Sequence, residues 1–280
     1  MIINLFVGIS FGVGLALASF VGNIAYRGSF KSVVKGRSKC EKCDRKLSCI
    51  YLIPVLGYIF SKGKCPKCKY KIPWYYPVSE LLLGIFFAVV FYYHTDIAND
   101  SLYELLHPYS YLLSDGFLIV TNLLFGIALY YFAVYDLIHM EIPATIVQYV
   151  SIAGILVLSL RIYEQGILFF AGNIFLILGL WLMFKFVNRN PDKQYVGEGD
   201  MYFLIMTLLC VPWSFVLSAI WMASFLGGLV SVVTMIKYPK KWKSIKVPYI
   251  PILVLGFLIS YIFGFNGYII NLVDMLILNK

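Results

Sequence analysis

Two carboxylates and four cysteines are the residues of this chain whose types and spacing best suit chemistry. Asp200 ends the stretch Gly197-Glu198-Gly199-Asp200 and stands at the start of a long apolar run. An ionisable group at such a boundary is costly and by default indicates function. Gly197 and Gly199 let the backbone approach another group closely. Asp136 closes a second charge-free run, so it is a candidate partner for Asp200.

Two carboxylates placed together in apolar surroundings cannot both ionise, so one keeps its proton while the other stays charged. The charged group can take a proton from water and the protonated group can donate to a peptide carbonyl, which is acid–base hydrolysis without a covalent nucleophile. Motifs of other hydrolases, such as Gly-x-Ser-x-Gly and His-Glu-x-x-His, are absent from the sequence. Two alternatives remain open: each Asp caps a helix at the membrane interface, or the pair forms a proton or cation site in a non-enzymatic protein.

Four cysteines form two Cys-x-x-Cys pairs, Cys40 with Cys43 and Cys65 with Cys68, separated by 21 residues. Each pair brings two thiolates to one side of a turn, and two pairs make a closed tetrahedral site typical of structural zinc. A closed site leaves no position for water, so we expect the metal to stabilise a segment too small to bury much core. A pair of redox-active dithiols is the alternative.

The elements that must position these residues are strongly apolar. The chain has 280 residues, of which 61% are hydrophobic and 13% are charged, and its mean hydropathy is +0.83. Charge-free runs of roughly 20 residues, long enough to cross a bilayer as helices, recur along it. We therefore predict an all-α polytopic membrane protein, because a soluble domain of this composition would lack the polar surface to cover its core.

The charges are distributed unevenly along the chain. Residues 27–76 hold 13 Lys and Arg against two acids, and residues 237–246 hold five Lys. Residues 94–115 hold four acids and no Lys or Arg. The positive-inside rule places the two basic segments in the cytoplasm and the acidic one outside. Topology thus accounts for the basic segments, and we expect no nucleic-acid partner.

These features together predict about eight transmembrane helices. The expected spans are residues 2–26, 77–93, 116–138, 142–160, 166–186, two helices within 201–236, and 248–273. The run 201–236 is about twice as long as one bilayer crossing requires, and Pro212-Trp213 is the natural place for it to turn. We expect three domains: the first transmembrane helix at 1–26, a cytoplasmic four-cysteine zinc-binding insertion at 27–76, and a transmembrane peptidase domain at 77–280.

Several motifs in a fixed order resemble the type IV prepilin peptidases, which are membrane aspartyl proteases with a Gly-x-Gly-Asp motif. The matching stretches are Ser19-Phe20 to Tyr26-Arg27, Gly36 to Cys40, Ile53 to Tyr58, Tyr76 to Leu81, Asp136 with Ile142-Pro143, Gly197 to Asp200, and Val247 to Pro251. The resemblance covers nearly the whole chain. One departure is Tyr202, which stands where the family usually has lysine.

The resemblance implies two groups of site residues. The catalytic pair would be Asp136 and Asp200, and the zinc ligands Cys40, Cys43, Cys65 and Cys68. It also implies cleavage of a short basic leader peptide from type IV prepilins or prepilin-like pseudopilin and competence proteins, near the cytoplasmic face of a bacterial plasma membrane. Many members then methylate the new N-terminus with S-adenosylmethionine. No motif for this cofactor stands out here, so an N-methyltransferase activity is implied by the family alone.

Other readings of the same residues stay open at this point. Another Gly-x-Gly-Asp protease, cleaving inside helices, would explain the Asp pair but not the zinc insertion. A zinc-stapled membrane assembly protein with a cation or proton site is the non-enzymatic alternative. The basic insertion would repel a basic leader, so we expect it to face anionic membrane lipids. The sequence gives no indication of oligomeric state.

Overall fold

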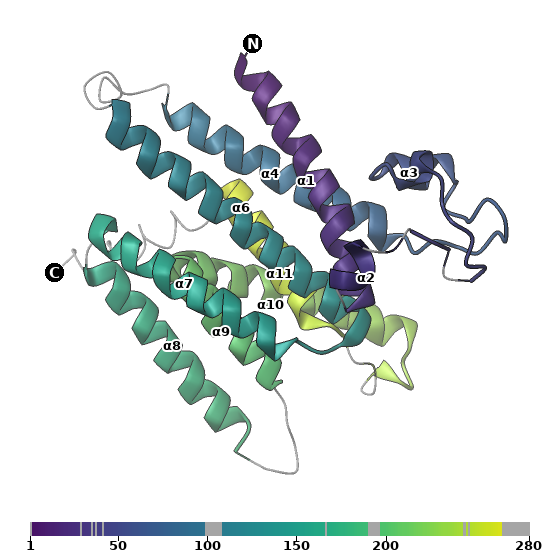
Figure 1. Ribbon diagram of the computed structural model, residues 1–280. Helices are drawn as coiled ribbons and strands as arrows, with labels where there is room; N and C mark the ends of the chain where they lie inside the picture. The colour runs from purple at the N-terminus through teal and green to yellow at the C-terminus, as the bar shows by residue number, and fades with distance from the viewer. Residues whose placement is uncertain are drawn as a thin grey trace. The chain divides into compact units, whose positions relative to one another are not determined.

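The computed structural model describes residues 2–28, 30–34, 36, 38–40, 42–98, 108–165, 167–189, 197–242, 245 and 247–264. Within these ranges the regular structure is helical, apart from two isolated antiparallel bridges that join Lys39 to Lys46 and Lys64 to Lys71. The chain divides into two compact units, Met1–Tyr135 and Asp136–Lys280 (Figure 1).

The first unit holds two long helices that pack closely, with an insertion between them. Its elements are α1 (Ile2–Arg27), α2 (Phe30–Val34), η1 (Cys49–Leu52), α3 (Leu56–Phe60), α4 (Tyr75–Ala98) and most of α6 (Pro108–His139). A Cβ atom on Gly14 of α1 would come within 2.9 Å of the Cα atom of Gly84 in α4. The hydroxyl of Ser10 donates to the carbonyl of Phe87 at 3.0 Å. Small and hydroxyl residues at such contacts are typical of membrane helices.

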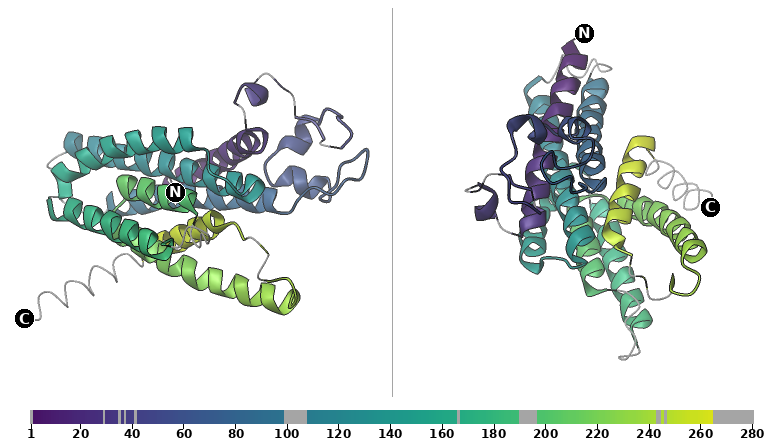
Figure 2. Two further views of the ribbon diagram at one scale, coloured as in Figure 1. Left: turned by 90° about the horizontal axis from the view of Figure 1, so that it is seen from below. Right: turned by 90° about the vertical axis from the view of Figure 1, so that its right-hand side faces the viewer.

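The second unit holds the end of α6 and five further helices. These are α7 (Ala144–Gln165), α8 (Ile167–Val187), α9 (Glu198–Cys210), α10 (Trp213–Lys237) and α11 (Tyr249–Phe263). Helices α10 and α11 lie side by side (Figure 2). A Cβ atom on Gly256 would come within 2.5 Å of the carbonyl oxygen of Ala219, so glycine is required for this approach. The hydroxyls of Ser218 and Ser260 hydrogen-bond across the same contact.

Helices α9 and α10 are separated by a break at Pro212. Proline has no N–H, so the carbonyl of Leu208 lacks the donor that a continuous helix would supply. The side-chain nitrogen of Asn173 in α8 donates to the carbonyls of Leu208 (2.8 Å) and Val211 (3.3 Å). Its side-chain oxygen accepts the N–H of Trp213 at 2.7 Å. Because backbone groups inside a bilayer must be satisfied within the protein, this fully buried side chain stabilises the break.

The predicted all-α membrane architecture is confirmed. Among the described residues, eight helices have 13 residues or more, and each corresponds to one expected span. The run 201–236 is divided at Pro212, as its length predicted. Four helices, α1, α4, α6 and α10, are long and apolar enough to cross a membrane, and α7, α8 and α11 contain shorter apolar segments.

Three helices extend five residues or more beyond their expected spans, and one of them is α7, which continues to Gln165 against an expected end at residue 160. Helix α4 continues to Ala98 and α6 begins at Pro108, whereas the apolar runs predicted boundaries at residues 93 and 116. Helix α6 therefore has 32 residues, about 48 Å at 1.5 Å per residue, which exceeds a hydrocarbon core of about 30 Å. An apolar run marks only the part of a helix that lies in the hydrocarbon core of the membrane. The helix itself can continue beyond this part, because its backbone hydrogen bonds also form in polar sequence. Of the expected span 248–273, the part after residue 264 lies outside the described residues.

Candidate active site and metal centre

Asp136 lies in the last turn of α6, and its side chain is 7% exposed. The backbone N–H of Ile250 donates to its Oδ2 atom at 3.2 Å. Ile250 belongs to the first turn of α11, where N–H groups have no partner within the helix and where the helix dipole favours negative charge. The start of α11 therefore supplies this buried carboxylate with a fixed hydrogen-bond donor.

Asp200 lies in the first turn of α9, together with Glu198. The backbone amide of Gly197, which caps this helix, faces the Asp200 carboxylate. A Cβ atom on Gly197 would lie 3.2 Å from the Oδ2 atom of Asp200, which is closer than an ordinary van der Waals contact. Glycine at this position thus leaves room for the carboxylate over the positive end of its own helix.

The structure brings Asp136 and Asp200 together, although they belong to different helices. Their carboxylates are close enough for their charges to interact. The segments that carry them also touch, because a Cβ atom on Gly199 would come within 3.0 Å of the Cδ1 atom of Ile142. Gly199 therefore lets the first turn of α9 rest against the chain that follows α6. The two glycines of the Gly-x-Gly-Asp motif have different structural reasons, one beside the carboxylate and one at the contact between segments.

The surroundings of the pair include a phenol but no cation from position 202. Tyr249, at the start of α11, lies within electrostatic reach of Asp200. The side chain of Tyr202 is 57% exposed. The residue at this position therefore points largely to the outside of the protein and adds no positive charge to the site.

A carboxylate pair held in this way can divide the roles of acid and base. One member can stay ionised and take a proton from water, while the other keeps a proton for a peptide carbonyl. The N–H of Ile250 orients Asp136, and the first turn of α9 orients Asp200. That these two residues catalyse hydrolysis stays a prediction, and the geometry is compatible with it.

The four cysteines of the insertion form one cluster, made of Cys40, Cys43, Cys65 and Cys68. Their sulfur atoms all lie within 4.8 Å of one another, with 3.6 Å between Cys40 and Cys68 and 4.0 Å between Cys43 and Cys65. In a tetrahedral site with Zn–S bonds of about 2.3 Å, the sulfur atoms are about 3.8 Å apart. The cluster could therefore hold one metal ion, and its ligand set suits zinc.

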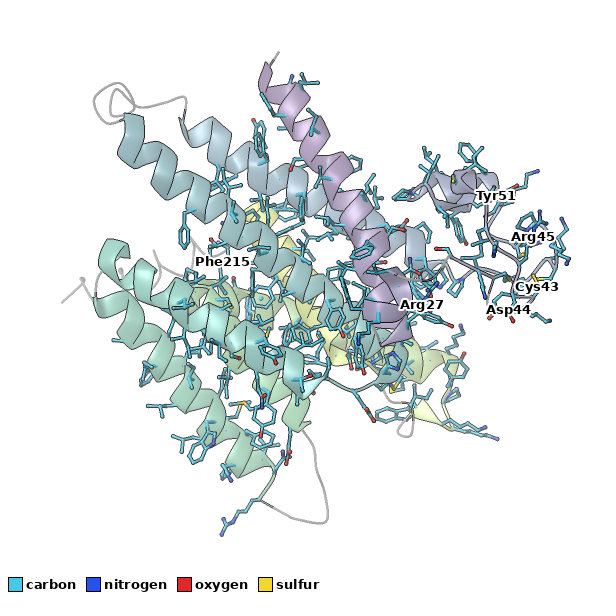
Figure 3. The ribbon with its side chains drawn as sticks, in the orientation of Figure 1. Arg27, Cys43, Asp44, Arg45, Tyr51 and Phe215 are labelled. Carbon is cyan, nitrogen blue, oxygen red and sulfur yellow. The ribbon has the colours of Figure 1, made fainter. Side chains whose placement is uncertain are left out.

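The two Cys-x-x-Cys pairs share one backbone conformation, which aims both at a common point. In the first pair, the N–H of Cys40 donates to the carbonyl of Arg45 (3.0 Å) and the N–H of Asp44 to that of Cys40 (2.9 Å). The second pair repeats these bonds, from Cys65 to Tyr70 at 2.8 Å and from Lys69 to Cys65 at 3.0 Å. The residue after each second cysteine has a positive φ, +52° at Asp44 and +58° at Lys69. Figure 3 shows Cys43, Asp44 and Arg45 within the insertion.

The insertion also prepares one of its thiols for metal binding. The backbone N–H groups of Cys68 and Lys67 point at the sulfur of Cys65 and lower the pKa of this thiol to about 6. The thiolate is the form that binds a metal ion. Cys49 is exposed and Cys210 belongs to α9, so neither is part of the cluster.

Sequence reasoning did not find the N–H of Ile250 as the partner of Asp136. A backbone group has no side-chain signature, and the partners are far apart in the sequence. The available signal was Val247-Pro248-Tyr249-Ile250-Pro251, because prolines mark the start of a helix, where N–H groups have no partner within the helix.

Two family models match this chain. The model of the bacterial peptidase A24 N-terminal domain matches residues 13–94, which include α4 up to His94 and the cysteine cluster. The model of the type IV leader peptidase family matches residues 123–232, which include Asp136 and Asp200. Together they cover more than half of the chain.

The chain is also similar to curated proteins named prepilin leader peptidase/N-methyltransferase. It is 40% identical to that of Bacillus subtilis over 81 residues, which are 29% of this chain and 33% of the relative. It is 25% identical to that of Myxococcus xanthus over 237 residues, which are 83% of this chain and 64% of the relative. The matched region thus spans less than two thirds of the length of either relative. No solved structure matches the chain significantly.

Proposed function

We propose that this chain, which belongs to the type IV leader peptidase family, cleaves the basic leader peptide of prepilins or prepilin-like proteins with the carboxyl groups of Asp136 and Asp200. The names of its relatives support this activity, since they are prepilin leader peptidase/N-methyltransferases. The substrates we propose are type IV prepilins, pseudopilins or competence proteins.

The observation that carries the proposal is that the segments bearing the two carboxylates touch within one unit of the fold. Asp136 ends α6 and Asp200 begins α9, and their charges interact. The contact between Gly199 and Ile142 holds the two motif segments together. Separate helix caps would not need such a contact, so the juxtaposition favours a shared role.

In the proposed reaction, the ionised carboxylate removes a proton from water while the oxygen of that water attacks the carbonyl carbon of the scissile peptide. The protonated carboxyl donates its proton to the carbonyl oxygen, which gives a tetrahedral intermediate. Collapse of the intermediate breaks the C–N bond. The leaving nitrogen takes the proton removed from water, and one hydroxyl of the intermediate returns its proton to the other carboxylate as the C=O bond forms again. The pair ends with one proton, as it began, so it is ready for another cycle.

We further propose that Cys40, Cys43, Cys65 and Cys68 bind one structural zinc ion. Four thiolates within 4.8 Å of one another support this assignment. A closed site of this kind contributes folding free energy to a small segment and takes no part in peptide hydrolysis.

The N-methyltransferase part of the relatives' names supports a second activity, transfer of a methyl group from S-adenosylmethionine to the new N-terminus. We place the enzyme in a bacterial plasma membrane with its active site near the cytoplasmic face, since the basic segments 27–76 and 237–246 favour that orientation. The division into a first helix (1–26), a zinc-binding insertion (27–76) and a peptidase domain (77–280) is part of this proposal.

The proposal is tested by co-expressing the chain with a type IV prepilin and measuring the mass of the product. Cleavage removes the leader, and methylation adds the mass of a methyl group, so one spectrum separates the two activities. We expect Asp136→Asn and Asp200→Asn each to leave the prepilin uncleaved, and Asp96→Asn, a matched change in the last turn of α4, to cleave it normally. Full cleavage by either active-site variant would reject the aspartyl peptidase.

A further inference from the structure

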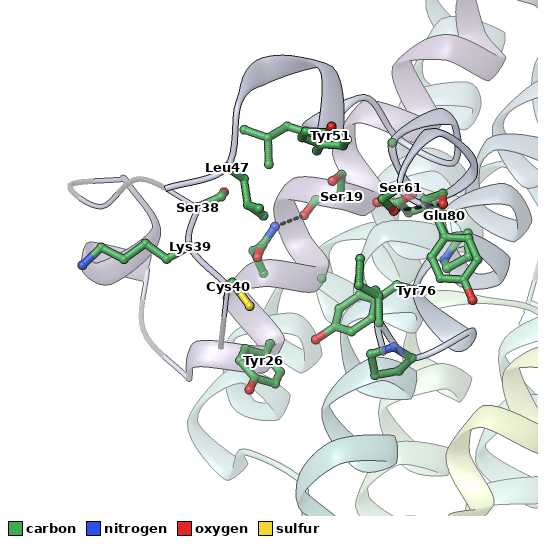
Figure 4. A pocket seen from close by; sticks show the side chains of 18 of the residues that line it. Ser19, Tyr26, Ser38, Lys39, Cys40, Leu47, Tyr51, Ser61, Tyr76 and Glu80 are labelled. Carbon is green, nitrogen blue, oxygen red and sulfur yellow. Dashed lines mark hydrogen bonds between the residues drawn. The ribbon is translucent and has the colours of Figure 1, made fainter. Parts of the chain in front are cut away.

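A cavity of 520 Å³ lies in the first unit, where the insertion folds back onto the end of α1 and the start of α4 (Figure 4). Cavities of a few hundred Å³ fit small organic ligands. The zinc ligands Cys40 and Cys65 belong to its wall, but the proposed peptidase centre in the second unit does not. The cavity therefore has no role in the chemistry described so far.

Aromatic rings dominate the chemistry of this cavity. Six of the described residues around it are tyrosines, namely Tyr26, Tyr51, Tyr58, Tyr70, Tyr76 and Tyr130. The rings of Tyr26 and Tyr76 are 6.4 Å apart between centroids. Aromatic faces attract cations within about 6 Å and form the cages that bind methylated onium groups. They also stack on flat heterocycles. Such a wall favours a ligand that combines a cationic centre with an aromatic ring.

The half-buried carboxylate of Glu80 adds a negative charge to the same wall. Its Oε2 atom accepts the N–H of Val55 at 2.7 Å, and the hydroxyl of Ser19 is a second partner. A carboxylate has about four acceptor positions, so these two bonds leave capacity for a ligand. Two cations, Arg27 and Lys39, also belong to the wall, and the side chain of Lys39 points away from Glu80 and the labelled tyrosines (Figure 4). The negative charge is therefore not neutralised by Lys39.

We propose that this tyrosine-lined cavity binds S-adenosylmethionine, with Glu80 and the tyrosine faces holding its sulfonium cation. The inference rests on the proposed methyltransferase activity and assigns its donor site. The cofactor fits the wall chemically, because it carries an onium centre next to a flat adenine ring. When bound, it supplies an electrophilic methyl group for an amine.

A purely structural role for Glu80 makes different predictions. The bond to Val55 holds the linker between the two Cys-x-x-Cys pairs, where Val55 has a φ of +60°. Glu80→Gln keeps an acceptor oxygen for this N–H but removes the charge. If Glu80 only holds the linker in place, Glu80→Gln should leave ligand binding unchanged. If its charge binds a cation, the substitution should weaken ligand binding.

The experiment measures binding to the detergent-solubilised, metal-replete full chain by isothermal titration calorimetry. The ligands are S-adenosylmethionine, S-adenosylhomocysteine, which lacks the methyl group and the positive charge, and choline. The variants are Glu80→Gln and Tyr76→Leu. Their matched controls are Glu141→Gln and Tyr149→Leu, which change exposed residues of the second unit that do not line the cavity. Zinc content reports whether each variant keeps the fold of the insertion.

We expect Glu80→Gln to weaken S-adenosylmethionine binding about 10-fold or more and to change S-adenosylhomocysteine binding less than about twofold. Tyr76→Leu should weaken both ligands, and the controls neither. If the Glu80→Gln variant loses zinc, the binding measured for Tyr76→Leu tests the proposal instead, since that variant keeps the hydrogen bond between Glu80 and Val55. The proposal is overturned if wild-type protein binds no S-adenosylmethionine, if both variants bind it normally, or if choline binds more tightly.

Prepilin cleavage by the same preparation, without added cofactor, separates the two proposals. Cleavage without S-adenosylmethionine binding would reject the cavity assignment and keep the peptidase. Binding that depends on Glu80 and Tyr76 without cleavage would keep the cavity assignment and reject the peptidase.

Discussion

Replacing Asn173 with leucine tests how the second unit tolerates a helix break at membrane depth. The side chain of Asn173 is fully buried and bonds three backbone groups, the carbonyls of Leu208 and Val211 and the N–H of Trp213. Leucine has similar volume but no polar atoms. The substitution therefore removes all three bonds without opening a large cavity, and Pro212 prevents the chain from closing the gap with a regular helix.

The structure gives the size of the expected effect. Side-chain hydrogen bonds within membrane proteins average about 0.6 kcal/mol, so three bonds give about 2 kcal/mol. A buried polar group left without any partner costs about 1–3 kcal/mol. The loss in unfolding free energy is therefore larger if the backbone groups around Pro212 cannot move to find new partners. We expect Asn173→Leu to lower the free energy of unfolding by about 2–4 kcal/mol.

The assay is reversible unfolding in mixed micelles with increasing dodecyl sulfate, followed by the fluorescence of Trp213 in a background in which the other four tryptophans are replaced by phenylalanine. The indole of Trp213 packs against Gly172, where a Cβ atom would come within 2.4 Å of its ring, so its emission reports the break itself. Asn23→Leu is the control, because its one bond runs to the Ser19 carbonyl four residues earlier in its own helix. Equal unfolding midpoints for Asn173→Leu and wild type would refute the role given to Asn173.

Three further predictions concern the active site, the metal and the membrane. Gly199→Val should reduce the rate of prepilin cleavage about 10-fold or more, because the added side chain pushes α9 away from Ile142. Ile142→Ala in the same chain should restore much of the rate, and no rescue would argue against this contact. Cys43→Ser should lose zinc by elemental analysis and make the insertion sensitive to protease, while Cys49→Ser keeps both; retained zinc in the first variant would contradict a four-thiolate site. Amide hydrogen exchange of the insertion should be slower in nanodiscs of anionic lipid than in nanodiscs of neutral lipid. The double substitution Lys31→Glu and Lys62→Glu should remove this difference, and an unchanged difference would reject the lipid-facing surface.

The sequence predicted those features that depend on strong local constraints. Two Cys-x-x-Cys pairs can converge only if the chain between them folds back, so Cys40 and Cys65 were expected in one cluster and lie in one. The run 201–236 is too long for one crossing, so the division near Pro212 followed from length and proline chemistry. Apolar length and charge asymmetry likewise predicted the eight long helices.

Other features depend on contacts that leave no pattern in the sequence. Asn173 is a single polar residue in an apolar run, and nothing near it in the sequence shows that it bonds the backbone around Pro212. The donor to Asp136 is the backbone N–H of Ile250, a group that almost every residue carries. The cavity beside Glu80 arises only when the insertion folds onto α1 and α4. Long-range backbone partners and cavities are therefore what the structure adds.

The central claim is that Asp136 and Asp200 act as one catalytic unit. The most direct test measures the rate of prepilin cleavage by purified wild type, Asp136→Asn, Asp200→Asn and the double variant under single-turnover conditions. General acid–base groups contribute about 10²–10⁴-fold, and residues that act together show losses that do not multiply. We expect each single variant to lose at least about 100-fold in rate and the double variant to be no slower than the slower single variant. Normal cleavage by either single variant, or losses that multiply in the double variant, would contradict it.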